Sequence, residues 1–69
     1  MIKLIENNYY KIKGYKLPLQ FKGIVEGDYI CDLCNKPHYF KQLPILYWFE
    51  VNKDNWAKFG TSCIKKVIE

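Results

Sequence analysis

The chain carries three cysteines, Cys31, Cys34 and Cys63, in only 69 residues. A domain this small buries only about 60% of the surface of its unfolded chain, so its hydrophobic core leaves it marginally stable. Such domains often add a disulfide, a metal ion or a partner to their core. Three cysteines cannot all pair with one another, and a cytosol would keep them reduced. We therefore expect these cysteines to bind a metal ion.

The spacing of these cysteines suits one metal site. Two residues separate Cys31 from Cys34, so one tight turn can direct both thiolates at the same ion, and His38 follows after three more residues. A gap of 28 residues separates Cys34 from Cys63, and a predicted hairpin in this gap can bring Cys63 back. Three sulfurs and one nitrogen match a tetrahedral structural zinc site. We predict a Zn²⁺ held by Cys31, Cys34, His38 and Cys63. An acidic side chain, a water molecule or a partner residue could replace His38.

Two local details fit a zinc knuckle, which is a tight C-x-x-C turn. The residue after the second cysteine of a knuckle commonly needs a positive φ, and Asn35 tolerates this conformation well. Cys63 is expected at a helix N-terminus, where the helix dipole and free amides would stabilise its thiolate. Two alternatives are buried cysteines without metal and a redox pair. The redox pair is disfavoured because no βαβ pattern surrounds the motif.

The apolar pattern predicts a single α+β domain, 1–69, that is mostly β and ends in a short helix. Strands are expected over Tyr9–Leu17, Phe21–Ile30, Ile45–Val51 and Trp56–Phe59. The last two should form a hairpin around the turn Asn52–Asn55. The helix should start near Cys63, capped by Thr61 or Ser62, and should bury Ile64, Val67 and Ile68.

The sequence Cys31-x-x-Cys34, followed by a hairpin and then by Phe59-Gly60-Thr61-Ser62-Cys63-Ile64-Lys65-Lys66-Val67, resembles small zinc-ribbon or treble-clef-like proteins, including several encoded by phages. The resemblance covers residues 30–68 and implies a zinc-stabilised pair of hairpins with a C-terminal helix. Asn35 stands where such proteins usually have glycine. Lys66 and Val67 occupy the positions of a second helical ligand, so the resemblance also requires His38 as the fourth ligand.

The formal net charge of +4 comes from eleven basic residues, all of them lysine, and seven acidic ones. Residues 9–22 contain four lysines and no acid, whereas Glu26, Asp28 and Asp32 follow soon after. Positive charge is therefore expected on a local face. The chain has no arginine, whose planar guanidinium group can donate two hydrogen bonds to the edge of guanine. Specific recognition of guanine is therefore disfavoured.

The first functional hypothesis is binding of nucleic acid or a nucleoprotein complex. A strand over Tyr9–Leu17 would place Tyr9, Lys11, Lys13 and Tyr15 on one face, with two cations between two rings that can stack on bases. Further phosphate contacts could come from Lys16, Lys22, Lys65 and Lys66. The alternative is that the tyrosines cover the edge of the core and the lysines only solvate a strand.

The second hypothesis is a protein-binding inhibitor of a host enzyme or of an antiviral defence complex, similar in role to an anti-CRISPR protein. Aromatic anchors would be Tyr39, Tyr47, Trp48 and Trp56. An exposed strand edge could also form a homodimer.

We do not expect an enzyme, because the chain has one histidine and no H-x-E or H-E-x-x-H motif. No apolar run reaches the roughly 18 residues of a membrane helix. The apolar stretch at the N-terminus is too short, and charged residues interrupt it too early, for a signal peptide. The expected location is the cytoplasm, or the host cytoplasm if the protein is viral, without membrane contact.

Overall fold

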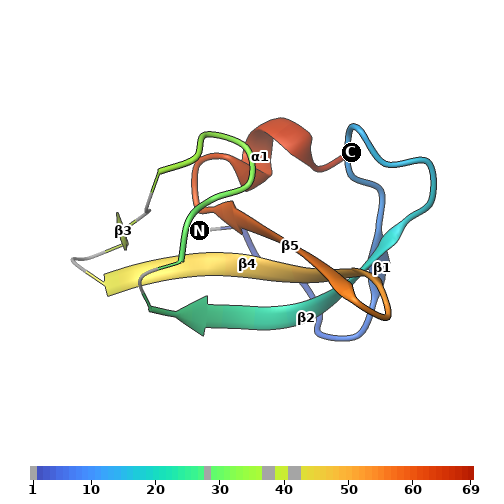
Figure 1. Ribbon diagram of the computed structural model, residues 1–69, viewed down its shortest axis with the longest axis horizontal. Coiled ribbons are helices and arrows are strands. Elements are labelled where there is room, and N and C mark those ends of the chain that lie inside the picture. Colours follow the sequence, from blue (N-terminus) through green and yellow to red (C-terminus); the bar gives the residue numbers. More distant parts are fainter. Residues whose placement is uncertain (1, 28, 37–38, 41–42) are drawn as a thin grey trace.

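The computed structural model describes residues 2–27, 29–36, 39–40 and 43–69. They form a small β-rich domain with one short helix, α1 (Figure 1). The elements in chain order are β1 (Tyr9–Tyr10), β2 (Leu19–Glu26), β3 (Tyr39–Phe40), β4 (Leu43–Asn52), β5 (Asn55–Gly60) and α1 (Ile64–Val67).

Strand β4 lies at the centre of an antiparallel sheet, with β2 on one side and β5 on the other. The short β1 extends the outer edge of β2, and β3 pairs with the beginning of β4. The strands curl, and α1 covers one face of the sheet (Figure 1). The predicted hairpin is confirmed. Its tight turn consists of Lys53 and Asp54, where Asn52 Oδ1 accepts hydrogen bonds from Asp54 N at 3.1 Å and Asn55 Nδ2 at 3.0 Å.

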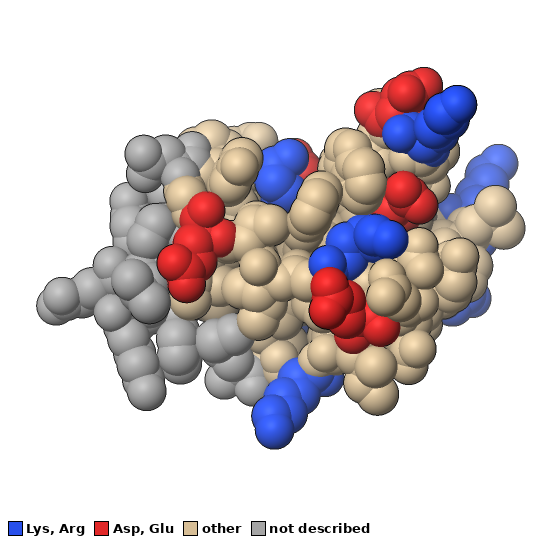
Figure 2. Space-filling model, turned by 90° about the horizontal axis from the view of Figure 1, so that it is seen from below, with Lys and Arg blue, Asp and Glu red and all other residues tan. Residues whose placement is uncertain are grey.

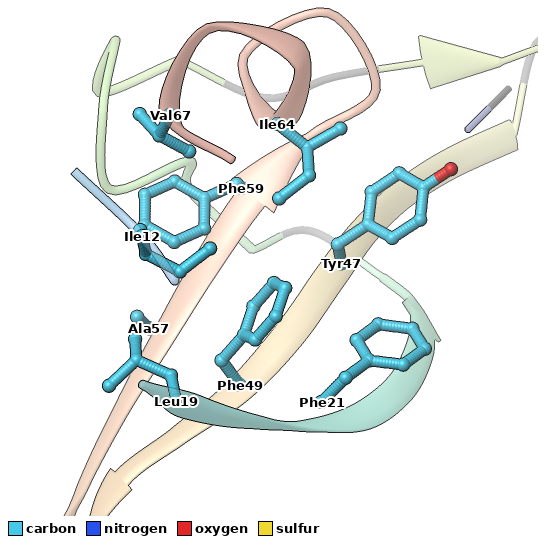
Figure 3. Close-up of a cluster of buried hydrophobic side chains, with 9 residues drawn as sticks. All are labelled: Ile12, Leu19, Phe21, Tyr47, Phe49, Ala57, Phe59, Ile64 and Val67. Atoms are coloured by element: carbon cyan, nitrogen blue, oxygen red, sulfur yellow. The ribbon is translucent and has the colours of Figure 1, made fainter. Parts of the chain in front are cut away.

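The main core lies between the sheet and α1 (Figure 3). Side chains alternate along β4, so Tyr47 and Phe49 point into this core while Trp48 lies on the opposite face. Phe21 of β2 joins them, with its ring 5.3 Å from Phe49 and 5.9 Å from Tyr47. The Tyr47 hydroxyl donates to the carbonyl oxygen of Ile2, which ties the N-terminal segment to the core. The buried members are Ile12, Leu19, Phe21, Tyr47, Phe49, Ala57, Phe59, Ile64 and Val67.

The prediction of a strand over Tyr9–Leu17 is wrong beyond its first two residues. Gly14 has φ 93°, and Tyr15 N bonds Ile12 O at 3.1 Å, so the chain turns here. Burial of Ile12 drives this arrangement, because its side chain enters the core and its backbone bridges Ile68. The four residues Tyr9, Lys11, Lys13 and Tyr15 therefore do not share one strand face.

The second predicted strand is shifted toward the N-terminus. It begins at Leu19, and a bulge at Lys22 and Gly23 allows Phe21 to pair with Phe49 and Gly23 to pair with Trp48. Gly23 has φ 126°, a conformation that residues with a side chain rarely adopt.

The helix is confirmed but is shorter than expected, and the predicted caps are wrong. Its N-cap is Cys63, which makes no side-chain capping bond, and neither Thr61 nor Ser62 holds that position. A helix of one turn cannot persist alone, so the burial of Ile64 and Val67 must hold it. Within the described part of the chain, no helix has the length and apolar character needed to cross a membrane.

Candidate metal centre

The three cysteines come together, as their spacing predicted. Their Sγ atoms all lie within 4.8 Å of one another. Four ligands around one Zn²⁺ at about 2.3 Å place neighbouring sulfurs about 3.8 Å apart, so small side-chain shifts suffice to close such a site. Cys31 and Cys63 are buried, Cys34 is half-buried, and none of the three is in a disulfide. This cluster can hold a metal ion.

The segment between Cys31 and Lys36 forms the predicted knuckle. Asn35 N donates to Cys31 O at 2.9 Å, and Cys31 N donates to Lys36 O at 3.1 Å. These two bonds reverse the chain within six residues and direct Cys31 and Cys34 to one side. The turn requires φ 59° at Asn35, which confirms the positive φ expected there. Asparagine accepts this conformation more readily than most residues with a side chain.

Backbone amides converge on the sulfur of Cys31. Leu33 N lies 3.4 Å from this Sγ, and Gly60 N of β5 lies 3.3 Å from it. Burial acts to raise the pKa of the Cys31 thiol, but hydrogen bonds from the N–H groups of Cys34, Gly60 and Leu33, together with one from the Cys63 side chain, outweigh it and lower the pKa. The fold therefore favours a thiolate at Cys31, which is the form that binds metal.

Cys63 behaves differently from the expectation. Burial, together with the sulfurs of Cys31 and Cys34, raises the pKa of Cys63 to about 12. A helix of one turn contributes too little to reverse this effect, so the predicted stabilisation of the thiolate by the helix is wrong. Repulsion between neighbouring negatively charged sulfurs opposes ionisation of Cys63. A bound cation would offset this repulsion and so favour the thiolate.

Asp32 fixes the knuckle to the sheet, a role that sequence reasoning missed. Asp32 N donates to Lys58 O at 2.7 Å, and Lys58 N donates to Asp32 Oδ2 at 2.6 Å. Together with the bond from Gly60 N to Cys31 Sγ, these contacts cover the outer edge of β5. No local pattern shows this role, because the two partners lie 26 residues apart.

A small apolar cluster surrounds the cysteines, separate from the main core. Leu46 is fully buried against Cys31 and Cys63, with Val25 packed beside them. Leu46 and Val25 are cross-strand partners on the sheet face opposite Tyr47 and Phe49. The described part of the chain therefore forms two buried clusters, and the cysteines are the larger part of the second.

The fourth predicted ligand, His38, lies outside the described residues. Among the residues that the structure describes, the metal-competent group consists of the three cysteines alone. Three sulfurs leave one coordination position of a tetrahedral site to be filled.

The predicted binding residues are spread over several elements. Tyr9, Lys11, Lys13 and Lys16 are exposed along 9–16, whose chain turns at Gly14. Tyr15 is also exposed in this segment, and the remaining three are Lys22 on β2 and Lys65 and Lys66 on α1. Seen from below, the molecule presents acidic and basic side chains side by side on a largely uncharged surface (Figure 2). No uniformly cationic face appears in this view.

The resemblance to zinc-ribbon and treble-clef-like proteins rests on the sequence pattern around the cysteines. No family model matches the chain, and neither the comparison with curated proteins nor that with solved structures found a match.

Proposed function

We propose that this chain is a non-enzymatic binding module of the zinc-ribbon type, held together by a structural Zn²⁺ bound to Cys31, Cys34, Cys63 and His38. The observation that carries the proposal is the convergence of three sulfurs within 4.8 Å. Thiolates are soft ligands that select zinc over magnesium or calcium. The knuckle and the start of α1 supply these sulfurs from opposite ends of a hairpin, so the ion joins segments that are distant in sequence.

Such a site would stabilise the fold and perform no reaction. A tetrahedral centre with four protein ligands has no open position for a water molecule or substrate. Burial of Cys31 and Cys63 supports this assignment, because catalytic metals need access for the substrate. The activity of the module would then reside on its surface.

Metal content tests the zinc proposal directly. Native mass spectrometry of the purified protein should show one Zn²⁺ per chain, and Co²⁺ substitution should give the absorption bands of a thiolate-rich tetrahedral site. Cys31→Ser and Cys63→Ser should abolish binding, whereas Ser62→Ala, beside Cys63 on an exposed side chain, should retain it. His38→Ala should weaken binding strongly. A metal-free protein that remains folded would overturn the proposal.

We further propose that the surface binds single-stranded nucleic acid. The support is the exposed run Lys11, Lys13 and Lys16, which lies in a stretch of sequence without acidic residues. Fluorescence anisotropy with a labelled oligonucleotide should show affinity that falls with salt. The triple variant with glutamine at these three positions should reduce the salt slope by about 0.7 for each lost phosphate contact. A protein recovered from host lysate after nuclease treatment, without oligonucleotide binding, would instead support the inhibitor hypothesis.

A further inference from the structure

A pocket of about 280 Å³ opens on the sheet face that α1 does not cover. Its described lining residues come from all three long strands and from the segment before the knuckle, and they are Val25, Tyr29, Trp48, Trp56 and Lys58. The register explains this assembly, because Gly23, Trp48 and Lys58 form one cross-strand row and Trp56 follows in the next. The pocket is thus part of the sheet and adjoins the cysteine cluster, with which it shares Val25.

Aromatic rings make up most of the pocket. The centroids of Trp48 and Trp56 are 4.7 Å apart, with an angle of 42° between the rings. Trp56 is 39% exposed and Tyr29 is 49% exposed, so both present ring surface to solvent. Gly23 stands opposite Trp48 across the sheet, and the Glu6 carboxylate lies 3.4 Å from the place where a Cβ of Gly23 would be. Neither the main core nor the cysteine cluster includes these three rings.

The two ends of the pocket differ in charge, and this difference would orient a charged ligand. Lys58 is the charged residue among the described lining residues, and the knuckle holds its backbone through both bonds to Asp32. The Asp32 carboxylate accepts a hydrogen bond from the Lys58 backbone N–H, which partly compensates the negative charge of this carboxylate. On the far side, Glu50 is the cross-strand partner of Trp56 and would repel an anion. An anionic group is therefore favoured at the Lys58 end and disfavoured at the Glu50 end.

We infer that this pocket binds one nucleotide unit, with its base against Trp56 and Trp48 and its phosphate at the Lys58 ammonium group. This inference rests on the proposed nucleic-acid binding and assigns it a site apart from Lys11, Lys13 and Lys16. Aromatic stacking accepts any base, since every base has a π-face. A cationic ligand, which aromatic cages also bind, is disfavoured because Lys58 lines the pocket.

A base with a phosphate can come from a free nucleotide or from a single strand, and titration separates the two sources. Labelled oligothymidylate, its duplex with oligoadenylate, and free nucleoside monophosphates as competitors should be compared at several salt concentrations. We expect the single strand to bind and the duplex to bind more weakly, because paired bases are unavailable for stacking. Competition by micromolar nucleotide would identify the free nucleotide as the ligand, and its absence would identify the strand.

Variants decide whether the pocket is the site. Trp56→Ala should weaken binding of the single strand by about 5- to 150-fold at every salt concentration, which corresponds to the loss of one stacked base. Trp56→Phe should restore most of the affinity, and Leu17→Ala, on another exposed apolar side chain, should leave it unchanged. Lys58→Gln should lower the salt slope by about 0.7, as for the loss of one phosphate contact with a single strand.

Unchanged affinity in Trp56→Ala, with zinc retained, would overturn the inference. It would leave the proposed role of Lys11, Lys13 and Lys16 standing if their triple variant still loses affinity. Binding of an aromatic peptide at this pocket in preference to any nucleotide would also overturn it.

Discussion

Asn35 has the backbone conformation on which the knuckle depends. At φ 59° a β-branched residue is strained by about 1–2 kcal/mol, whereas glycine is not. We therefore expect Asn35→Gly to leave the free energy of unfolding within about 0.5 kcal/mol and Asn35→Val to lower it by about 1–2 kcal/mol. Urea denaturation measures both.

Asn7 provides a matched control, because it has φ 71° and lies far along the chain from the cysteines. Asn7→Val should cost similar stability but should not alter the affinity for Zn²⁺, whereas Asn35→Val should lower both. Equal metal affinity in the two variants would show that the knuckle conformation is not tied to metal binding.

Tyr47 combines full burial with a hydrogen bond to Ile2, and burial raises the pKa of its hydroxyl. The unfolded tyrosine ionises near pH 10, while the folded one keeps its proton to higher pH. Ionisation therefore favours the unfolded chain, and this contribution to stability is lost as the pH rises above about 10.

Tyr47→Phe should lower the free energy of unfolding by about 1 kcal/mol at pH 7, because the hydrogen bond is lost. The difference between wild type and variant should shrink above about pH 10, as measured by urea denaturation across pH. A difference that stays constant to pH 11 would contradict the assigned cause.

At the scale of elements, the sequence predicts best what depends on neighbours along the chain. Strands β4 and β5 alternate in side-chain character around a polar turn, so the hairpin was predicted nearly to its ends. The β-rich composition of Tyr9–Leu17 was misleading, because burial of Ile12 and the bridge to Ile68 decide its path. The cysteine cluster was predictable from spacing alone, whereas the pocket was not, since it depends on strand register.

Asp32 also links two elements of the fold, because it joins the knuckle to β5. Asp32→Ala removes the acceptor of the Lys58 amide proton, so this edge should open more often. We expect hydrogen exchange of the Lys58 amide to accelerate about five- to tenfold, as for the loss of one exposed hydrogen bond. Two-dimensional NMR with deuterium exchange measures this rate.

Asp32→Asn, which keeps an acceptor oxygen, should have a smaller effect on this exchange. Asp54→Ala, in the turn of the same hairpin, should leave the Lys58 amide unchanged. An equal acceleration at every amide of the sheet would indicate global destabilisation and would contradict the local role of Asp32.

Among the residues that the structure describes, nine buried ones form the main core, and a second cluster is built around cysteines. A core of this size gives only a few kcal/mol of net stability, whereas structural zinc in small domains contributes about 10–16 kcal/mol of apparent binding free energy. Removal of the proposed Zn²⁺ by a strong chelator should therefore lower the thermal midpoint by more than about 20 °C. Circular dichroism measures the transition.

Addition of Zn²⁺ should restore that midpoint, and the Cys63→Ser variant should not respond to the chelator. An unchanged midpoint in protein shown to be metal-free would mean that the two clusters suffice without an ion.

The bonds that join the knuckle to β5 have a consequence for solubility. While Asp32 and Cys31 occupy the outward amides of Lys58 and Gly60, no second chain can add a strand there. Oxidation of the cysteines, or removal of the proposed Zn²⁺ by a competing chelator, would release the knuckle and leave these amides without partners. The same hairpin then becomes a template for intermolecular β-sheet, so that oxidation of the cysteines, or loss of the proposed Zn²⁺, would promote aggregation of the domain.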